Sequence, residues 1–151
     1  MNPTRLMIIA MLLLLTLAAC TPPEVGITVE DAWVRTSVVD SPMGDIIPLN
    51  DTVAYLRIRN NSSKTDILTG AESPAARVVE IYKTTMFNDV ESTQSVTALE
   101  IPAGGEVSLD SGSYYLMLID LQQALTNGNE VEITLIFERA GRVTVKAEVL
   151  E

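Results

Sequence analysis

The sequence predicts a single all-β domain, a small sandwich of short strands behind an N-terminal targeting segment. Apolar and polar residues alternate with period two over most of the chain, and turn-forming residues interrupt the alternation at short intervals. The length of 151 residues suits one hydrophobic core. Only residues 121–125, closed by Asn127-Gly128, could form one helical turn.

The first residues have the features of a lipoprotein signal peptide. Arg5 supplies a positive charge, residues 7–17 are apolar, and small residues then precede Cys20, whose thiol would receive the lipid. A transmembrane anchor is the alternative, but this run is short for a hydrocarbon core of about 30 Å. We expect residues 1–19 to be removed and Cys20 to be lipidated.

The mature chain is then expected as a tethered domain on the extracytoplasmic face of a bacterial membrane, in the periplasm or at the cell surface. Residues 20–25 would hold the lipidated cysteine and a short tether stiffened by prolines, and residues 26–151 would form the domain. Strands are expected at residues 26–35, 53–59, 66–71, 77–84, 95–99, 106–109, 113–119, 130–137 and 142–149. Residues 37–51 form the one long connection.

Alternation and turn chemistry justify these elements. The cleanest alternation lies in residues 53–59, 130–137 and 142–149. In the first of them, Leu56 and Ile58 share a face opposite Arg57 and Arg59, as expected of a strand with one buried and one solvated side. Turn residues separate the strands at Asn60-Asn61-Ser62-Ser63, Ser73-Pro74, Pro102-Ala103-Gly104-Gly105, Asp110-Ser111-Gly112, Asn127-Gly128 and Ala140-Gly141.

Composition argues against several classes of function. The chain has 20 acidic and 10 basic residues, a net charge of −10, so its surface should repel nucleic acid. Lipidation would consume the only cysteine, which leaves no thiolate and no disulfide. Histidine is absent, and with it the usual general base and the commonest nitrogen ligand for metals. We therefore do not expect an enzyme.

Two tyrosines and two methionines could carry chemistry. Tyr115 and Met117 project from one face of the same expected strand, since side chains alternate. Tyr82 lies on another expected strand, and Met86 falls just beyond its end. Side chains of this kind at alternate strand positions usually belong to a core, so the local pattern alone favours packing over ligand binding.

Five short stretches are more informative when they are taken together. They are Trp33-Val34-Arg35, Ala54-Tyr55-Leu56-Arg57-Ile58-Arg59-Asn60, Ile101-Pro102-Ala103-Gly104-Gly105, Tyr115-Leu116-Met117-Leu118 and Leu135-Ile136-Phe137-Glu138-Arg139-Ala140-Gly141. In this order they resemble the periplasmic copper chaperones of the PCu(A)C family over about residues 27–149. The resemblance implies a cupredoxin-like Greek-key β-sandwich that binds Cu(I) and delivers it to a copper centre of cytochrome oxidase. An oxidase subunit or an oxidase assembly protein would then be its partner.

The same resemblance implies where the metal ligands should lie. The two histidines and two methionines of the family's motif fall on Tyr82, Thr93, Tyr115 and Met117, and only Met117 retains a family ligand. Cu(I) is soft and prefers thioether and imidazole donors, whereas a neutral phenol with a pKa of about 10 binds it poorly.

One hypothesis keeps the copper. Met117 and Met86 would bind Cu(I) through their thioethers, and Met43 would add a third ligand if the long connection folds over the site.

The other hypothesis makes the chain a metal-independent binding or assembly module on the membrane surface. Tyr82 and Tyr115 would fill the space of the two histidines while each keeps a hydrogen-bonding hydroxyl. Alternatively, exposed tyrosines beside Tyr114 would form a contact patch for a protein partner.

Overall fold

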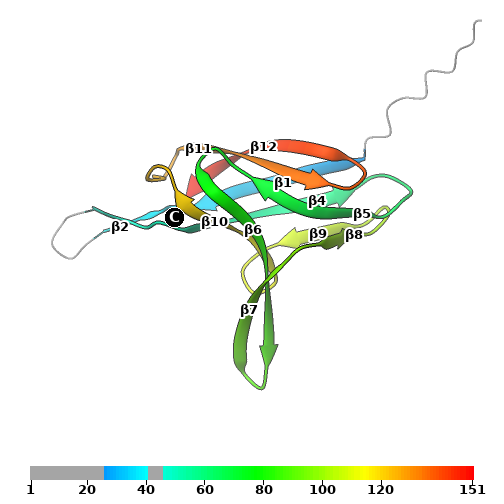
Figure 1. Cartoon of the computed structure of the whole chain (residues 1–151), viewed down its shortest axis with the longest axis horizontal. Coiled ribbons are helices and arrows are strands. Elements are labelled where there is room, and N and C mark those ends of the chain that lie inside the picture. Colours follow the sequence, from blue (N-terminus) through cyan, green and yellow to red (C-terminus); the bar gives the residue numbers. More distant parts are fainter. Residues whose placement is uncertain (1–25, 41–45) are drawn as a thin grey trace, which may run out of the picture.

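A computed structural model describes residues 26–40 and 46–151 of the chain, and these residues are built from strands (Figure 1). The strands are β1 (Ile27–Arg35), β2 (Val38–Asp40), β3 (Ile46–Pro48), β4 (Thr52–Asn60), β5 (Asp66–Glu72), β6 (Ala76–Phe87), β7 (Val90–Val96), β8 (Leu99–Ile101), β9 (Glu106–Leu109), β10 (Tyr114–Leu121), β11 (Glu130–Phe137) and β12 (Gly141–Leu150). Among the described residues, no helix is long and apolar enough to cross a bilayer. The predicted all-β class is confirmed.

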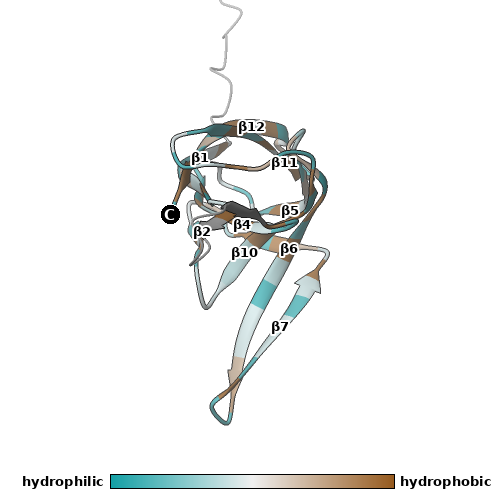
Figure 2. Ribbon diagram, turned by 90° about the vertical axis from the view of Figure 1, so that its left-hand side faces the viewer, coloured by the Kyte–Doolittle hydropathy of each residue, from teal (hydrophilic) through white to brown (hydrophobic). Residues whose placement is uncertain are grey.

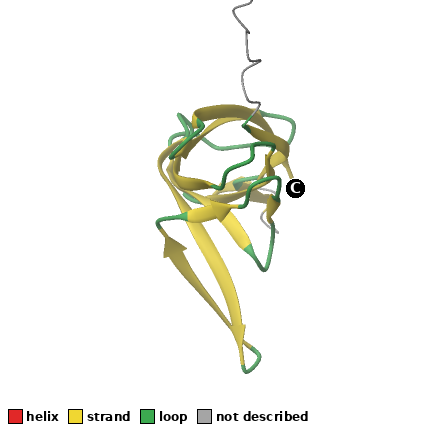
Figure 3. Ribbon diagram, turned by 90° about the vertical axis from the view of Figure 1, so that its right-hand side faces the viewer, coloured by secondary structure: helices red, strands yellow, loops and turns green. Residues whose placement is uncertain are grey.

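One sheet curls into a closed ring, seen end-on in Figures 2 and 3. Ten strands join in the order β7-β6-β10-β9-β4-β1-β12-β11-β5-β8. A further pairing of β5 with β6, through Ala71 and Val79, closes the ring. β1 lies between β4 and the C-terminal strand β12, with which it runs parallel. The connections therefore cross the ends of the ring, as they do in Greek-key sandwiches.

The core is made by side chains that alternate toward the inside of the ring. On β4, Ala54 and Ile58 have no exposed surface, and on β11 the same is true of Ile133 and Leu135. These are the apolar positions that the period-two pattern places on one face of each strand. Burying a side chain of the size of leucine or isoleucine stabilises a fold by about 1.5–3 kcal/mol, so this alternation is the main source of stability.

Three expected elements are wrong in detail. The expected strand at residues 95–99 is divided between β7 and β8. The expected helical turn at residues 121–125 is absent, because the backbone of Leu125 bonds to Ser37 instead. Residues 37–51 are not a plain connection, since β2 and β3 pair with each other inside that range.

The hairpin formed by β6 and β7 extends well beyond the ring (Figures 1 and 2). β6 runs to Phe87, so Met86 lies inside this strand and not beyond its end. The chain then turns through Asn88 and Asp89, whose φ angles of 50° and 62° are those that a type I′ hairpin turn requires. Along β7 every side chain except the half-buried Val96 is exposed, which explains why its sequence lacks an apolar stripe.

Several expectations lie outside the described residues. They concern the signal peptide at residues 1–19, the lipidated Cys20 with the tether at residues 20–25, and Met43.

Candidate functional site

Strand pairing brings four residues to one face of β7, β6 and β10, and these are the residues on which the resemblance places the metal motif. Tyr115 on β10 lies directly opposite Tyr82 on β6, and Met117 is a diagonal neighbour of Tyr82 on the same side. Thr93 on β7 is its diagonal neighbour on the other side. Because residues two apart in a strand share a face, all four side chains lie on one surface with Tyr82 at its centre. We call these four residues together with Glu80 the tyrosine face.

The tyrosine face looks outward from the ring. Ile81, Leu116 and Leu118, which alternate with its residues, are buried in the core. Tyr82 and Tyr115 are only half-buried. The sequence-based preference for core positions is therefore wrong for these tyrosines, and their side chains are available to the surface.

The two tyrosines form a stacked pair. Their ring centroids are 5.6 Å apart and their planes are inclined by 16°. Such a pair stabilises a fold by about 0.5–1.5 kcal/mol beyond the area it buries. Two stacked phenols therefore occupy the positions at which the resemblance implies two imidazoles.

The surroundings of Tyr82 keep its phenol protonated. Burial raises the pKa of Tyr82 above its ordinary value, and a hydrogen bond and the negative charge of Glu80 raise it further, with smaller contributions from Tyr115 and Asp51. Phenolate is the form of tyrosine that binds metal ions, and this environment disfavours it. At neutral pH the centre of the face is therefore a neutral hydrogen-bonding group.

Met117 is the one soft donor of the tyrosine face. Its partners across the strands are Glu80 on β6 and Val53 on β4. Thr93 is exposed and offers only a hydroxyl, so a metal here would meet one thioether among oxygen donors. That donor set does not suit Cu(I).

Met86 lies on the same face of β6 as Tyr82 and is a diagonal neighbour of Thr93, but it is far from Met117. Glu80 is the partner of Met117, and Met86 lies six residues farther along β6 in the protruding hairpin. At about 3.3 Å per residue the two methionines are separated by ~20 Å along the strand. The side chain of Met86 is 65% exposed. The described residues also contain no group of three or more His, Cys, Asp or Glu side chains that could hold a metal ion.

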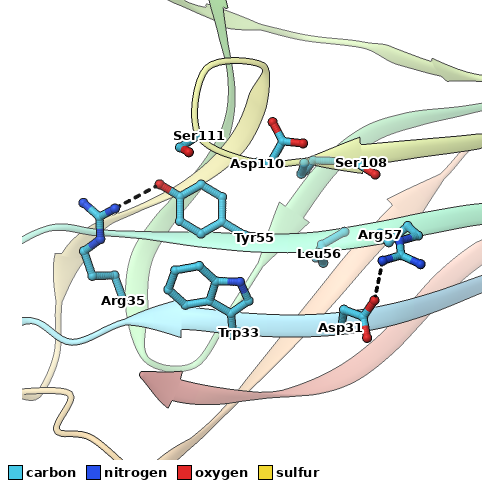
Figure 4. Close-up of a pocket in the computed structure, with 10 residues that line it drawn as sticks. Asp31, Trp33, Arg35, Tyr55, Leu56, Arg57, Ser108, Asp110 and Ser111 are labelled. Carbon is cyan, nitrogen blue, oxygen red and sulfur yellow. Dashed lines mark hydrogen bonds and ion pairs between the residues drawn. The ribbon is translucent and has the colours of Figure 1, made fainter. Parts of the chain in front are cut away.

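Sequence reasoning missed a second feature of the outer surface. A cavity of about 270 Å³ opens between β1, β4 and the loop that joins β9 to β10, and Trp33, Arg35 and Tyr55 line it (Figure 4). The period-two alternation could have revealed it, because Tyr55 and Trp33 fall on the face of their strands opposite the core residues Ala54 and Val34.

The fold is that of a PCuAC-type domain, and comparison with known proteins assigns the chain to a family. Residues 27–149 match the family model described as "Putative lipoprotein LpqE-like", and the chain belongs to this family. A relative from Leifsonia xyli subsp. xyli (strain CTCB07), named "Putative lipoprotein Lxx21020", is 32% identical over 113 residues. The match covers 74% of this chain and 62% of the relative, so the chain spans less than two thirds of that protein.

Solved structures share the fold, and one of them is named for a PCuAC domain. A structure named "Copper-bound PCuAC domain from PmoF2" is 25% identical, with a TM-score of 0.61, and the match covers 82% of this chain and 92% of that one. The solution structure of CuI-DR1885 from Deinococcus radiodurans is 28% identical, with a TM-score of 0.59 and coverage of 87% and 85%. These similarities confirm the predicted fold and the resemblance on which it was based.

Proposed function

We propose that this chain is a copper-chaperone-like lipoprotein of an extracytoplasmic membrane face that has kept the chaperone fold and lost tight copper binding. The observation that carries this proposal is the stack of Tyr82 and Tyr115, which stand where the resemblance implies the two histidine ligands. The domain then acts without a metal and without enzymatic activity, as a protein-binding or assembly module at the membrane surface.

The chemistry of the tyrosine face supports the loss of copper. Replacing two imidazoles and one thioether by two phenols and a hydroxyl removes three of the four soft donors. The raised pKa of Tyr82 removes the phenolate as a substitute. A single thioether, that of Met117, does not compete for Cu(I) with sites that offer several soft ligands.

The lipoprotein part of the proposal rests on sequence and on the family. Residues 1–19 would be removed, Cys20 would carry the lipid, and residues 20–25 would tether the domain to the membrane. The lipoprotein names of the family and of the relative from Leifsonia support this. The hairpin of β6 and β7 extends from the side of the ring away from the start of β1 (Figures 1 and 2). A tether at the start of β1 would leave that hairpin directed toward proteins and away from the lipid.

A residual Cu(I) carrier is the second candidate, and the position of Met117 favours it. Two structures of similar fold are named for bound copper, and Met117 lies at the one motif position where this chain keeps a family ligand. Such a carrier would need further donors besides Met117. Met43 is the remaining methionine that the sequence suggests as a copper ligand. The carrier's recipient would be the copper centre of cytochrome oxidase that the resemblance implies.

Competition for Cu(I) tests the proposal. The soluble chain from Thr21 onward is titrated anaerobically against a chromogenic Cu(I) chelator, beside Met117→Leu and, as a matched control, Met86→Leu. We expect all three proteins to leave the copper on the chelator to the same extent. Stoichiometric binding that Met117→Leu abolishes and Met86→Leu preserves would overturn the proposal in favour of the residual carrier.

A further inference from the structure

The cavity beside β1 is a second candidate binding site of this domain, distinct from the tyrosine face. It is walled by Trp33 and Arg35 of β1 and by Tyr55 of β4, and it is overhung by Asp110 and Ser111 of the loop between β9 and β10 (Figure 4). Its volume of about 270 Å³ is slightly below that of cavities for drug-sized ligands, which begin near 300 Å³. A ligand that fills it is therefore close to one amino-acid residue in size.

One wall of the cavity is aromatic. The rings of Trp33 and Tyr55 are 4.7 Å apart between centroids and are tilted by 40°. Trp33 is half-buried and Tyr55 is only 7% exposed, so most of the aromatic surface that a ligand can reach belongs to Trp33. A preformed aromatic wall of this kind suits a flat or apolar group.

Arg35 supplies a positive charge, and it forms no ion pair with a carboxylate among residues 26–38 and 49–151. Its guanidinium donates a long hydrogen bond of 3.4 Å to the hydroxyl of Tyr55 and lies 6.0 Å from the centroid of that ring. Arg57, which lines the other end of the cavity, is by contrast bound to Asp31 at 2.7 Å. In a chain of net charge −10, an arginine without an acid partner among those residues is a cation that a ligand can use.

A guanidinium offers five donors in a planar fork, and that fork matches a carboxylate in a bidentate arrangement. Figure 4 shows Arg35, the hydroxyl of Tyr55 and Ser111 gathered at one end of the cavity. A carboxylate at that end would meet charged and neutral donors together. Asp110 on the rim adds a negative charge, which disfavours a doubly charged anion such as a phosphate monoester.

We propose that this cavity binds a small monocarboxylate whose apolar body packs on Trp33 and Tyr55 and whose carboxylate is held by Arg35. The site goes beyond the function proposed above, because none of its residues belongs to the tyrosine face and it requires no metal.

Trp33 is the only tryptophan of the chain, so its fluorescence reports on the cavity without a label. The full chain, held in detergent, is titrated with N-acetyl-L-phenylalanine while only the indole is excited. We expect a saturable change in emission. N-acetyl-L-phenylalanine amide, which has the same apolar body without the charge, should give no saturable change, and phenyl phosphate should bind more weakly than the carboxylate.

Two arginine variants test whether Arg35 holds the carboxylate. Arg35→Gln should weaken binding of N-acetyl-L-phenylalanine about tenfold or more, as expected for a hydrogen-bonded ion pair. Arg59→Gln is the matched control, since Arg59 lies on the outer side of β4 but is bound to Glu106 at 2.8 Å and does not line the cavity. It should leave binding unchanged.

Three results would overturn the proposal. They are an emission that never saturates with the carboxylate, equal binding of the acid and its amide by the unaltered chain, and tighter binding of phenyl phosphate. None of the three needs a variant, so a failure of Arg35→Gln to fold cannot mask them.

Discussion

Restoring the family's ligands to the tyrosine face should restore a copper site. The change is the triple substitution Tyr82→His, Thr93→Met and Tyr115→His, which leaves Met117 in place. Directly opposite residues in a sheet have Cβ atoms about 4.5–5.5 Å apart, and diagonal neighbours are about 7–8 Å apart. With Tyr82 as the common neighbour of the other three positions, two imidazoles and two thioethers can converge on one ion.

The expected effect on stability changes sign with copper. Without metal, loss of the stack between Tyr82 and Tyr115 should cost about 0.5–1.5 kcal/mol of unfolding free energy. For a domain of this size that corresponds to a fall in Tm of roughly 2–8 °C. With free Cu(I) at about a thousand times the dissociation constant, binding to the folded state adds about 4 kcal/mol. The variant should therefore melt below the unaltered protein when metal-free and above it when loaded.

Anaerobic thermal unfolding with and without buffered Cu(I) measures both the loss of stability in the metal-free variant and the gain on copper binding. The control is the double substitution Tyr82→Phe and Tyr115→Phe, which retains a stacked pair of rings and introduces no ligand, and whose Tm should not respond to copper. If the triple variant is folded and its Tm also fails to rise with Cu(I), the tyrosine face is not the position of the family's metal site.

Three further predictions concern stability. Asp66 is buried and its carboxylate accepts backbone N–H groups from its own strand and from the turn between β11 and β12, so Asp66→Ala should cost about 3 kcal/mol or more in chemical denaturation. A cost no larger than that of an exposed substitution would contradict this role. Burial and Glu80 raise the pKa of Tyr82 in the folded protein. The neutral phenol therefore contributes its full stability below the pKa of the unfolded chain, about 10, and this contribution is lost as the pH rises through the pKa of the folded protein. Denaturation at alkaline pH should therefore show a steeper loss for the unaltered protein than for Tyr82→Phe, and identical curves would refute the assignment. Asp89 has a φ of 62°, so Asp89→Gly should raise the unfolding free energy by a few tenths of a kcal/mol, and a fall would show that the turn depends on the aspartate side chain.

The strands that sequence predicted best are those with one buried side. β11 occupies the expected residues 130–137, and β4 and β12 each extend the expected range by one residue at both ends, because their inward side chains are apolar and alternate without interruption. The prediction for the residues of β7 was wrong for the opposite reason. Most of β7 lies on a protruding hairpin with no core on either side, so burial imposes no pattern on its sequence.

The candidate site was predictable in part. Spacing within the family's motif pointed to Tyr82, Thr93, Tyr115 and Met117, and strand register gathers these positions on one face. Register also places Met86 far from Met117, at the end of β6 beyond Thr93, which sequence could not foresee, because the length of β6 beyond the ring has no apolar signature. The cavity of Trp33 depends on contacts between β1 and β4 that only pairing creates.

The most direct test of the central claim is a site-resolved NMR titration of the soluble chain from Thr21 onward with one equivalent of Cu(I) under anaerobic conditions. The resonances to follow are the methyl group of Met117 and the rings of Tyr82 and Tyr115. If the stacked tyrosines have replaced the metal site, all three should keep their positions. A one-to-one shift of the Met117 methyl group in slow exchange, with movement of both rings, would show that copper still binds on the tyrosine face.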